Sequence, residues 1–181
     1  MSWDWGYARR ARQIAAAYEK HMSEVYGYLG YRVRNREDAE DLTQRTFELA
    51  LRSWGRYDPR RGSLRAWLLA IARNVLIDHH RAETTRTSVA ARAEMGTADH
   101  RAAASEEPVL GVSPELDAAL QALDMRSREV IALRFGGDLT AREIAEVLNL
   151  SVANVEQILS RALRRLRAEL ANVKPASTSG G

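Results

Sequence analysis

The sequence predicts an all-α protein: two small helical domains joined by a flexible linker, the second of them a helix-turn-helix domain. Three observations lead to this prediction. Apolar residues recur every three or four positions through most of the chain, which is the period of a buried helix face, and no stretch alternates as a half-buried strand does. Residues 83–113 lose this period. Residues 139–166 then read as two short helices joined by a tight turn.

The first domain is expected at residues 15–82, after a lead at 1–14 whose Trp3, Trp5 and Tyr7 have no assigned role. Three apolar stripes at helical spacing define its helices. They are Ile14, Tyr18, Val25, Tyr26 and Leu29; Ala39, Leu42, Thr46, Phe47, Leu49 and Ala50; and Leu64, Trp67, Leu68, Ile71, Ala72 and Val75. Ser63 is placed to cap the third helix.

The linker is expected at residues 83–113, which are rich in Ala, Thr, Ser and both charges and hold few large apolar groups. Such a segment buries too little surface to offset the entropy of ordering it. The second domain is expected at residues 114–172. Residues 173–181 are expected to form a disordered tail.

The second domain carries several helix-start and helix-stop signals. Ser113 can cap its first helix. In the helix-turn-helix, Thr140 and Glu143 stand at capping-box spacing. Asn149 can take the left-handed conformation that ends a helix, and Ser151 can cap the next one.

The last helix separates an apolar face from a polar one. The apolar stripe is Val155, Ile158, Leu159, Ala162, Leu163 and Leu166, and the opposite face holds Asn154, Glu156, Gln157, Ser160, Arg161, Arg164 and Arg165. Side chains on the first turns of such a helix can reach base edges in a major groove, while arginines further along meet phosphates. The alternative is an ordinary helical hairpin with a solvated face.

Composition narrows the class of protein. The formal charge is +3 and the pI is about 9.5, and Lys20 and Lys174 are the only lysines, so arginine supplies the cationic surface. Arginine suits phosphate and guanine, but so small a net charge argues against a non-specific DNA coat. The absence of cysteine excludes disulfides and zinc ribbons. No run approaches the roughly 18 apolar residues of a membrane span, and no export signal is evident, so we expect a soluble, cytoplasmic protein.

Two motifs in the first domain resemble a known family. Residues 38–47 read DAEDLTQRTF and residues 66–81 read AWLLAIARNVLIDHHR, and a helix-turn-helix follows them. Together they closely resemble an extracytoplasmic-function (ECF) sigma factor, a bacterial RNA polymerase specificity subunit of the sigma-70 family, over roughly residues 15–82 and 114–170. The resemblance implies a protein that is not an enzyme and that directs promoter-specific initiation by recognising minus-35 duplex and melting the minus-10 element. It implies core RNA polymerase, through its β′ and β subunits, and promoter DNA as partners, with an anti-sigma factor as a further candidate.

The resemblance assigns core binding to the helix that begins near Asp38. Its polar residues follow the spacing of one exposed stripe, and in the family this stripe binds a basic coiled coil of the β′ subunit. The candidate residues are Asp38, Glu40, Asp41, Gln44, Arg45 and Glu48. Without the resemblance, a solvated acidic face would be the simpler interpretation.

The resemblance assigns minus-10 melting to the third helix and the turn before it. Splayed bases need hydrogen-bonding edges, stacking surfaces and a cationic rim. The candidate residues are Trp54, Tyr57, Arg60, Arg61, Ser63, Arg65, Asn74 and Arg81. Asn74 matches a family position that faces the non-template strand, whereas Trp67 has apolar neighbours and is expected in the core.

The minus-35 candidates depart from the common family pattern. They are Arg142, Ser151, Ala153, Asn154, Glu156, Gln157, Ser160, Arg161, Arg164 and Arg165. Relatives usually carry glycine, threonine and a basic residue on the first turns, where this chain has Ala153, Asn154 and Glu156. Glutamate repels phosphate but accepts from the cytosine amino group, so the minus-35 sequence is expected to differ from the usual one.

Two rival functions compete with this interpretation. A stand-alone helix-turn-helix regulator would bind duplex DNA without polymerase. A metal-dependent hydrolase would use Asp78, His79, His80 and His100, but adjacent histidines on a helix point about 100° apart, so no metal or other cofactor is expected.

The resemblance also gives the linker a role, because in the family it threads the polymerase cleft. Its acidic residues Glu94, Asp99, Glu106 and Glu107 could mimic nucleic acid there. A passive tether fits the composition equally well.

Overall fold

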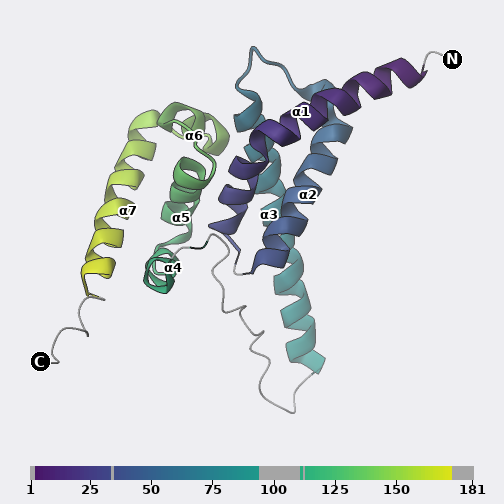
Figure 1. The fold of residues 1–181 in the computed structure, drawn as a ribbon. Coiled ribbons are helices and arrows are strands. Elements are labelled where there is room, and N and C mark those ends of the chain that lie inside the picture. The colour runs from purple at the N-terminus through teal and green to yellow at the C-terminus, as the bar shows by residue number, and fades with distance from the viewer. Residues whose placement is uncertain (1–2, 34, 94–110, 112, 173–181) are drawn as a thin grey trace, which may run out of the picture.

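The computed structural model describes residues 3–33, 35–93, 111 and 113–172. Within these ranges every regular element is helical, which confirms the all-α prediction (Figure 1). The elements are α1 (Trp3–Gly30), α2 (Arg36–Ser53), the 3-10 turn η1 (Trp54–Arg56), α3 (Leu64–Ala93), α4 (Pro114–Gln121), α5 (Met125–Ile131), the π turn η2 (Ala132–Gly136), α6 (Ala141–Leu148) and α7 (Val152–Asn172). Among the described helices, none has the length and apolar character that a bilayer crossing requires.

Helices α1, α2 and α3 pack on one another and form the first helical unit. Tyr28, Leu29, Leu68 and Leu76 are fully buried between them because they lie on the inward stripes of α1 and α3. Tyr18 was expected on the inner face of α1, but it is 45% exposed. Its ring meets Phe47 edge-on at 4.8 Å and lines a groove on the surface.

Two helices extend further than the sequence suggested. Helix α1 begins at Trp3, within the expected lead, and α3 continues to Ala93, past the expected start of the linker at residue 83. Thr84 and Thr85 donate their hydroxyls to backbone carbonyls one turn earlier, so this end of α3 bonds internally. The linker's remaining described residues are Gly111 and Ser113, and the tail lies outside the described residues.

The predicted caps of the second unit are confirmed. Ser113 accepts a hydrogen bond from Leu116 N–H, and Thr140 and Glu143 form a reciprocal capping box. Asn149 is left-handed, with φ of 52°. The Ser151 hydroxyl accepts a hydrogen bond from Asn154 N–H and so caps the start of α7.

A cap that sequence reasoning missed separates α4 from α5. Asp124 accepts from the N–H groups of Arg126 and Ser127, so it starts α5. The Arg128 guanidinium then reaches back and donates to the carbonyls of Leu120, Gln121 and Leu123 at the end of α4. Together these bonds fix the bend between the two short helices.

The two helical units pack directly on each other and share one apolar core. Helix α1 contacts η2 and α3 contacts α6. Figure 1 shows the second unit standing beside the first. Leu68 and Leu69 from the first unit belong to the same buried cluster as Leu133, Leu139 and Ile144 from the second. A second, smaller cluster joins α4, α5 and α7. The chain therefore folds as two units in contact.

Candidate functional site

The polar stripe of α2 faces solvent over most of its length. Glu40, Asp41, Gln44 and Arg45 are exposed, while Asp38 and Glu48 are half-buried. The contacts of Glu40 and Glu48 run along the helix surface: Glu40 accepts from Arg36 at 2.6 Å, and Glu48 accepts from Gln44 at 3.2 Å and from Arg45 at 3.3 Å. Exposed pairs of this kind are weak, so they can be exchanged for contacts with a partner.

An open groove of about 740 Å³ runs between α1 and α2 beside this stripe. Its floor is apolar and includes Tyr18, Met22 and Phe47, whereas Glu40 and Glu48 of the stripe stand among its lining residues. Tyr18 and Met22 are both partly open to solvent. An apolar floor with an acidic border fits an amphipathic helix whose polar face is basic.

Three aromatic rings pack together where the turn meets the first turn of α3. Trp67 lies 5.9 Å from Trp54 and 5.4 Å from Tyr57 between ring centroids, and it packs half-buried against the core, as expected. Trp54 also donates its indole N–H to Gln13 at 3.0 Å. Trp54 and Tyr57 thus present partly exposed rings from a fixed position.

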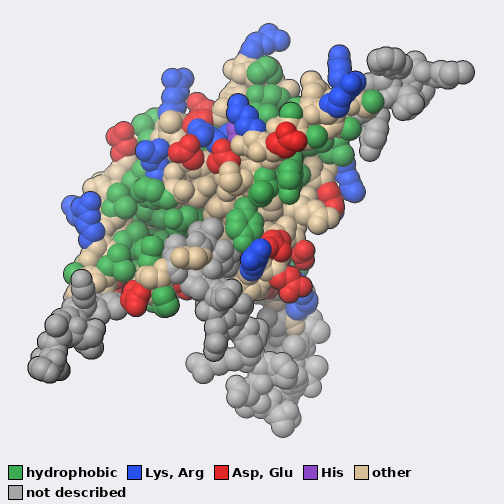
Figure 2. Space-filling view, in the orientation of Figure 1, with side chains coloured by type: hydrophobic (Ala, Val, Ile, Leu, Met, Phe, Trp, Pro, Cys, Tyr) green, Lys and Arg blue, Asp and Glu red, His purple; other side chains and the backbone are tan. Residues whose placement is uncertain are grey.

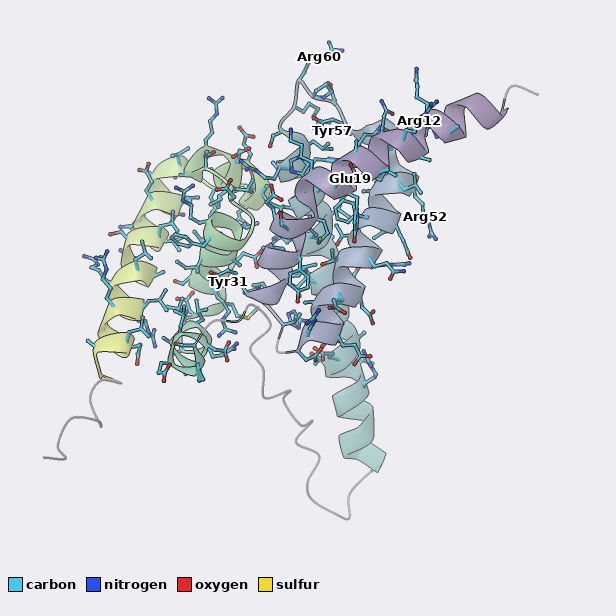
Figure 3. The ribbon with its side chains drawn as sticks, in the orientation of Figure 1. Arg12, Glu19, Tyr31, Arg52, Tyr57 and Arg60 are labelled. Atoms are coloured by element: carbon cyan, nitrogen blue, oxygen red, sulfur yellow. The ribbon has the colours of Figure 1, made fainter. Side chains whose placement is uncertain are left out.

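The turn between η1 and α3 exposes two arginine side chains to solvent. The Arg60 N–H donates to the Asp58 carboxylate at 3.0 Å, which folds the turn, and the Arg60 side chain points away from the molecule at its tip (Figure 3). Arg61 is also exposed. A pocket of about 300 Å³ lies beside the turn and is lined by Tyr57, Arg61 and Trp67 together with residues of α6.

Ser63 and Arg65 lie at this site but are already bonded to the second unit. The Ser63 hydroxyl donates to Glu143 at 2.7 Å, and it also caps α3, as predicted, by accepting from Ala66 N–H at 3.2 Å. Arg65 pairs with Asp138 at 2.7 Å and with Glu143 at 3.6 Å, and its side chain is 24% exposed.

The remaining minus-10 candidates lie further along α3. Asn74 is exposed, and so is Arg81, which pairs with Asp78 at 3.6 Å. Neither lines the pocket beside the turn. The structure therefore gathers the aromatic rings, the turn arginines and Ser63, and leaves Asn74 and Arg81 as separate points on the same helix.

The polar face of α7 is open to solvent. Each of its predicted contact residues is exposed, as are Arg142, Ser151 and Ala153, and Figure 2 shows basic side chains standing out along the edge formed by α7. Arg142 pairs with Glu146 at 3.5 Å and Arg165 with Glu169 at 4.0 Å. On the inner side, Val155, Ala162 and Leu166 are buried, so packing fixes which face points outward.

Sequence reasoning missed one cation beside this face. Arg126, in the first turn of α5, lines a hollow of about 280 Å³ together with Arg161 and Arg165 of α7. The Asp124 carboxylate also lines the hollow, so the three arginines leave it with a net positive lining that suits a phosphate. Arg126 gave no signal in the sequence because it lies outside the helix-turn-helix, and only the packing of α5 on α7 brings it there.

A cluster of polar side chains joins α2 to the middle of α3. Among the described residues, Asp38, His79 and Glu83 hold their potential ligand atoms within 4.8 Å of one another. His79 lies 3.8 Å from Asp38 and 3.5 Å from Glu83, and Asp38 also accepts from Asn35 at 2.7 Å. These contacts account for the cluster as a link between the two helices. This set shares only His79 with the residues of the rival hydrolase, and His100 of that hydrolase set lies outside the described residues. The acidic linker residues Glu94, Asp99, Glu106 and Glu107 also lie outside the described residues.

Comparisons with known proteins cover both units. Residues 17–86 match the family model of sigma-70 region 2, and residues 119–168 match that of sigma-70, region 4. The chain is 31% identical over 158 residues to the ECF RNA polymerase sigma factor SigX of Bacillus subtilis (strain 168), which covers 84% of this chain and 81% of SigX. It is 32% identical over 161 residues to the ECF RNA polymerase sigma factor BldN of Streptomyces coelicolor, and there the match spans 88% of this chain but only 61% of BldN.

The fold also resembles solved structures. CnrH, solved in complex with the cytosolic domain of CnrY, superposes with a TM-score of 0.65 at 26% identity, over 93% of this chain and 96% of CnrH. The sigma factor RpoE, solved with the anti-sigma factor NepR from Bartonella quintana, gives a TM-score of 0.69 at 20% identity over 91% of this chain and 99% of RpoE, which shows a shared fold.

Proposed function

The chain belongs to the ECF sigma factors of the sigma-70 family, and from that premise we propose which of its surfaces bind polymerase and which bind promoter DNA. Such a protein directs transcription initiation. A stand-alone regulator is not favoured, because residues 17–86 match sigma-70 region 2 and not only a helix-turn-helix. In our proposal the chain acts by binding and catalyses no reaction itself.

The α2 stripe is proposed to bind the coiled coil of the polymerase β′ subunit. The observation that best supports this is the pairing of exposed carboxylates with the apolar groove beside them. Carboxylates can form charge-assisted hydrogen bonds with basic side chains, while Tyr18 and Met22 can lose their exposed apolar area to the same helix. The two features together select an amphipathic, basic partner.

The turn before α3 is proposed to contact the opened minus-10 strand. The partly exposed rings of Trp54 and Tyr57 can stack on unpaired bases, and Arg60 and Arg61 can neutralise the phosphates beside them. Asn74 supplies an amide that can read a base edge. Ser63 and Arg65 lie on the same surface, where each is also bonded to a carboxylate of the second unit.

The polar face of α7 is proposed to read the minus-35 duplex. Asn154, Glu156 and Gln157 occupy the first turns of α7, from which side chains can reach base edges. Further along the helix, Arg161, Arg164 and Arg165 can contact backbone phosphates. Arg126 adds a phosphate contact from α5. An anti-sigma protein is proposed as a further partner by likeness to CnrH, which was solved with a bound protein.

Run-off transcription on a promoter library tests the proposal. Bacterial core polymerase is supplied with or without the chain, and transcript starts are sequenced. We expect initiation that depends on the chain and selects one pair of minus-35 and minus-10 sequences. If the folded chain neither binds core nor supports initiation, but binds duplex DNA alone, the stand-alone regulator is the better account.

A further inference from the structure

The early turns of α1 carry three arginines that have no acidic neighbour along the helix. Arg9, Arg10 and Arg12 are all exposed. Between Asp4 and Glu19 the sequence holds no carboxylate, so none of the three arginines has one within four positions. Ion pairs along a helix form between residues three or four positions apart. The helix therefore cannot neutralise these cations itself.

The three arginines also lack an ion pair with any other part of the chain that the structure describes. For comparison, Arg36 of α2 reaches Glu40, four positions on, at 2.6 Å. Arg9 and Arg12 lie three positions apart, and like charges that are neighbours on a helix surface repel each other. An anion bound from outside the chain would remove this repulsion, so the site favours an anionic partner.

A hydrogen bond fixes where these arginines lie. Trp54 donates its indole N–H to Gln13 at 3.0 Å, so α1 meets η1 at this point. Arg9 and Arg10 precede Gln13 by four and three positions, which places them on the same side of α1. One helical turn is about 5.4 Å long, so the two arginines stand about one turn beyond the Trp54 contact. They are therefore next to the surface proposed for the minus-10 strand.

Further cations lead from α1 to the turn before α3. Arg56 of η1 is exposed and lines the pocket beside that turn. Figure 3 shows Arg12 and Arg60 along one edge of the first unit, with Tyr57 between them. The arginines outside the turn form a basic edge, which consists of Arg9, Arg10, Arg12 and Arg56. This basic edge extends the cationic rim of the minus-10 surface toward the start of α1.

The chemistry of the basic edge selects phosphate. A guanidinium group binds two phosphate oxygens at once, which a point charge cannot do. The uncharged residues among the α1 arginines are Ala8, Ala11 and Gln13, so the described part of this run lacks the large apolar side chain on which a protein interface centres. Because the edge is continuous with the minus-10 surface, the phosphates within its reach are those of the same DNA.

We propose that the basic edge binds backbone phosphates that flank the minus-10 element on one side, and so extends the DNA contact of the first unit beyond the opened bases. This rests on the proposed function of the turn before α3, and it gives α1 a role in DNA binding. Phosphate contacts carry no sequence information, so the edge adds affinity and fixes position without choosing bases. Its contribution falls as salt rises, because each phosphate contact releases a counterion.

Strands of different length test the proposal on the holoenzyme, which is core polymerase with the chain bound. One fluorescent strand holds only the minus-10 element selected by run-off transcription, and two longer strands add several nucleotides on its 5′ or its 3′ side. In the parent holoenzyme, one of the longer strands is expected to bind more tightly than the short strand. If neither does, the proposal is overturned.

Removal of the α1 charges should abolish that gain. Arg9→Ala/Arg10→Ala/Arg12→Ala replaces the arginines by the strongest helix former, so α1 is kept. The variant is expected to bind the short strand as the parent does. For the longer strand, the slope of log affinity against log salt should fall by about two, since each single-strand phosphate contact contributes about 0.7.

A matched control removes the same number of charges from elsewhere. Arg52→Ala/Arg86→Ala/Arg167→Ala changes three exposed arginines on α2, α3 and α7 that lie outside the basic edge. It is expected to keep the parent's gain and the parent's salt slope on the longer strand. Equal slopes in the two triple variants would overturn the proposal, because the effect would then depend on net charge alone.

A photocrosslink locates the contacted nucleotides directly. The sequence has no cysteine, so Arg12→Cys accepts a single photoreactive label. Arg52→Cys is the control, because Arg52 is exposed on the last turn of α2 and points away from Arg60 (Figure 3). On the selected promoter, position 12 is expected to link to nucleotides beside the minus-10 element, and position 52 to none of them. Links from position 12 to polymerase subunits alone would overturn the proposal.

Core binding and initiation separate the possible failures. The α1 triple variant keeps the α2 stripe, so it should bind core polymerase as tightly as the parent chain does. Loss of core binding in this variant alone would show that the edge meets polymerase, which contradicts the proposal. Failure of the parent chain to initiate would refute the proposed function. Normal initiation by the parent chain, with equal salt slopes in the two triple variants, would refute the role of the basic edge alone.

Discussion

At the scale of single residues, Glu129 has the largest expected effect on stability. It accepts the Tyr28 hydrogen bond and faces the buried guanidinium of Arg32 and the partly exposed guanidinium of Arg73. Glu129→Ala leaves Arg32 and Arg73 without their counter-charge, so we expect the free energy of unfolding to fall by about 3 kcal/mol. Urea unfolding followed by circular dichroism measures this. Glu19→Ala on the exposed face of α1 is the control, expected to change stability by less than about 0.5 kcal/mol, and equal midpoints for the two variants would contradict the assignment.

Glu143 gives the fold a defined response to acid. Burial would raise its pKa, but hydrogen bonds from Thr140 and Ser63 and the charge of Arg65 lower the pKa overall. A carboxyl with a lowered folded-state pKa stabilises the fold above its unfolded pKa and loses that stabilisation as the pH falls through the folded value. We expect stability to decline below the ordinary carboxyl pKa of about 4.3, and Glu143→Gln to flatten that decline. Superimposable stability curves across this range in the two proteins would rule the effect out.

Glu156 and Arg164 are expected to affect DNA binding differently, although both are exposed on α7. Glu156→Ala should change which minus-35 sequence is preferred more than it changes overall affinity, because a carboxylate on the first turns acts on base edges. Arg164→Ala should weaken binding to every sequence and reduce the salt slope by about one unit. Binding to a panel of minus-35 duplexes at several salt concentrations distinguishes them. A uniform loss with Glu156→Ala would show that this glutamate does not read bases.

At the scale of elements, helix α2 offers the sharpest test of polymerase binding. Asp41 lies on the exposed stripe, whereas Glu37 is exposed on the first turn of the same helix outside the predicted set. Asp41→Arg should weaken binding to core polymerase at least tenfold, or about 1.4 kcal/mol, because it places a cation against a basic partner. Glu37→Arg makes the same charge change and should bind nearly as well as the parent chain. Equal losses would indicate a general charge effect in place of a defined contact.

Several helix starts and stops were predictable from local capping signals, although the equally local cap at Asp124 was missed. Ser113, Thr140, Asn149 and Ser151 act where their spacing indicated, because each cap involves residues three or four positions apart. The far end of α3 was predicted as linker. That prediction used composition, which indicates how much apolar surface a segment can bury and does not exclude a helix that buries little. Residues 83–86 are exposed, and Thr84 and Thr85 donate to carbonyls of the preceding turn.

At the scale of the whole molecule, the docking of the two units could not be read from the sequence. Periodicity shows which face of each helix is apolar, but not which faces meet, and the deciding contacts join distant positions: Gly27 with Gly136, and Ser63 with Glu143. Ser63 and Arg65 could be assigned to the minus-10 surface by resemblance. Only the structure gives them protein partners, which are Glu143 for Ser63 and Asp138 and Glu143 for Arg65.

The central claim is that the chain directs polymerase to a promoter through the α2 stripe, and initiation at the selected promoter tests it most directly. Run-off transcription with core polymerase should produce a transcript with the parent chain and with Glu37→Arg, and little or none with Asp41→Arg or with core alone. Transcript from Asp41→Arg equal to that from the parent chain would contradict the docking surface, and no transcript from the parent chain would contradict the function itself.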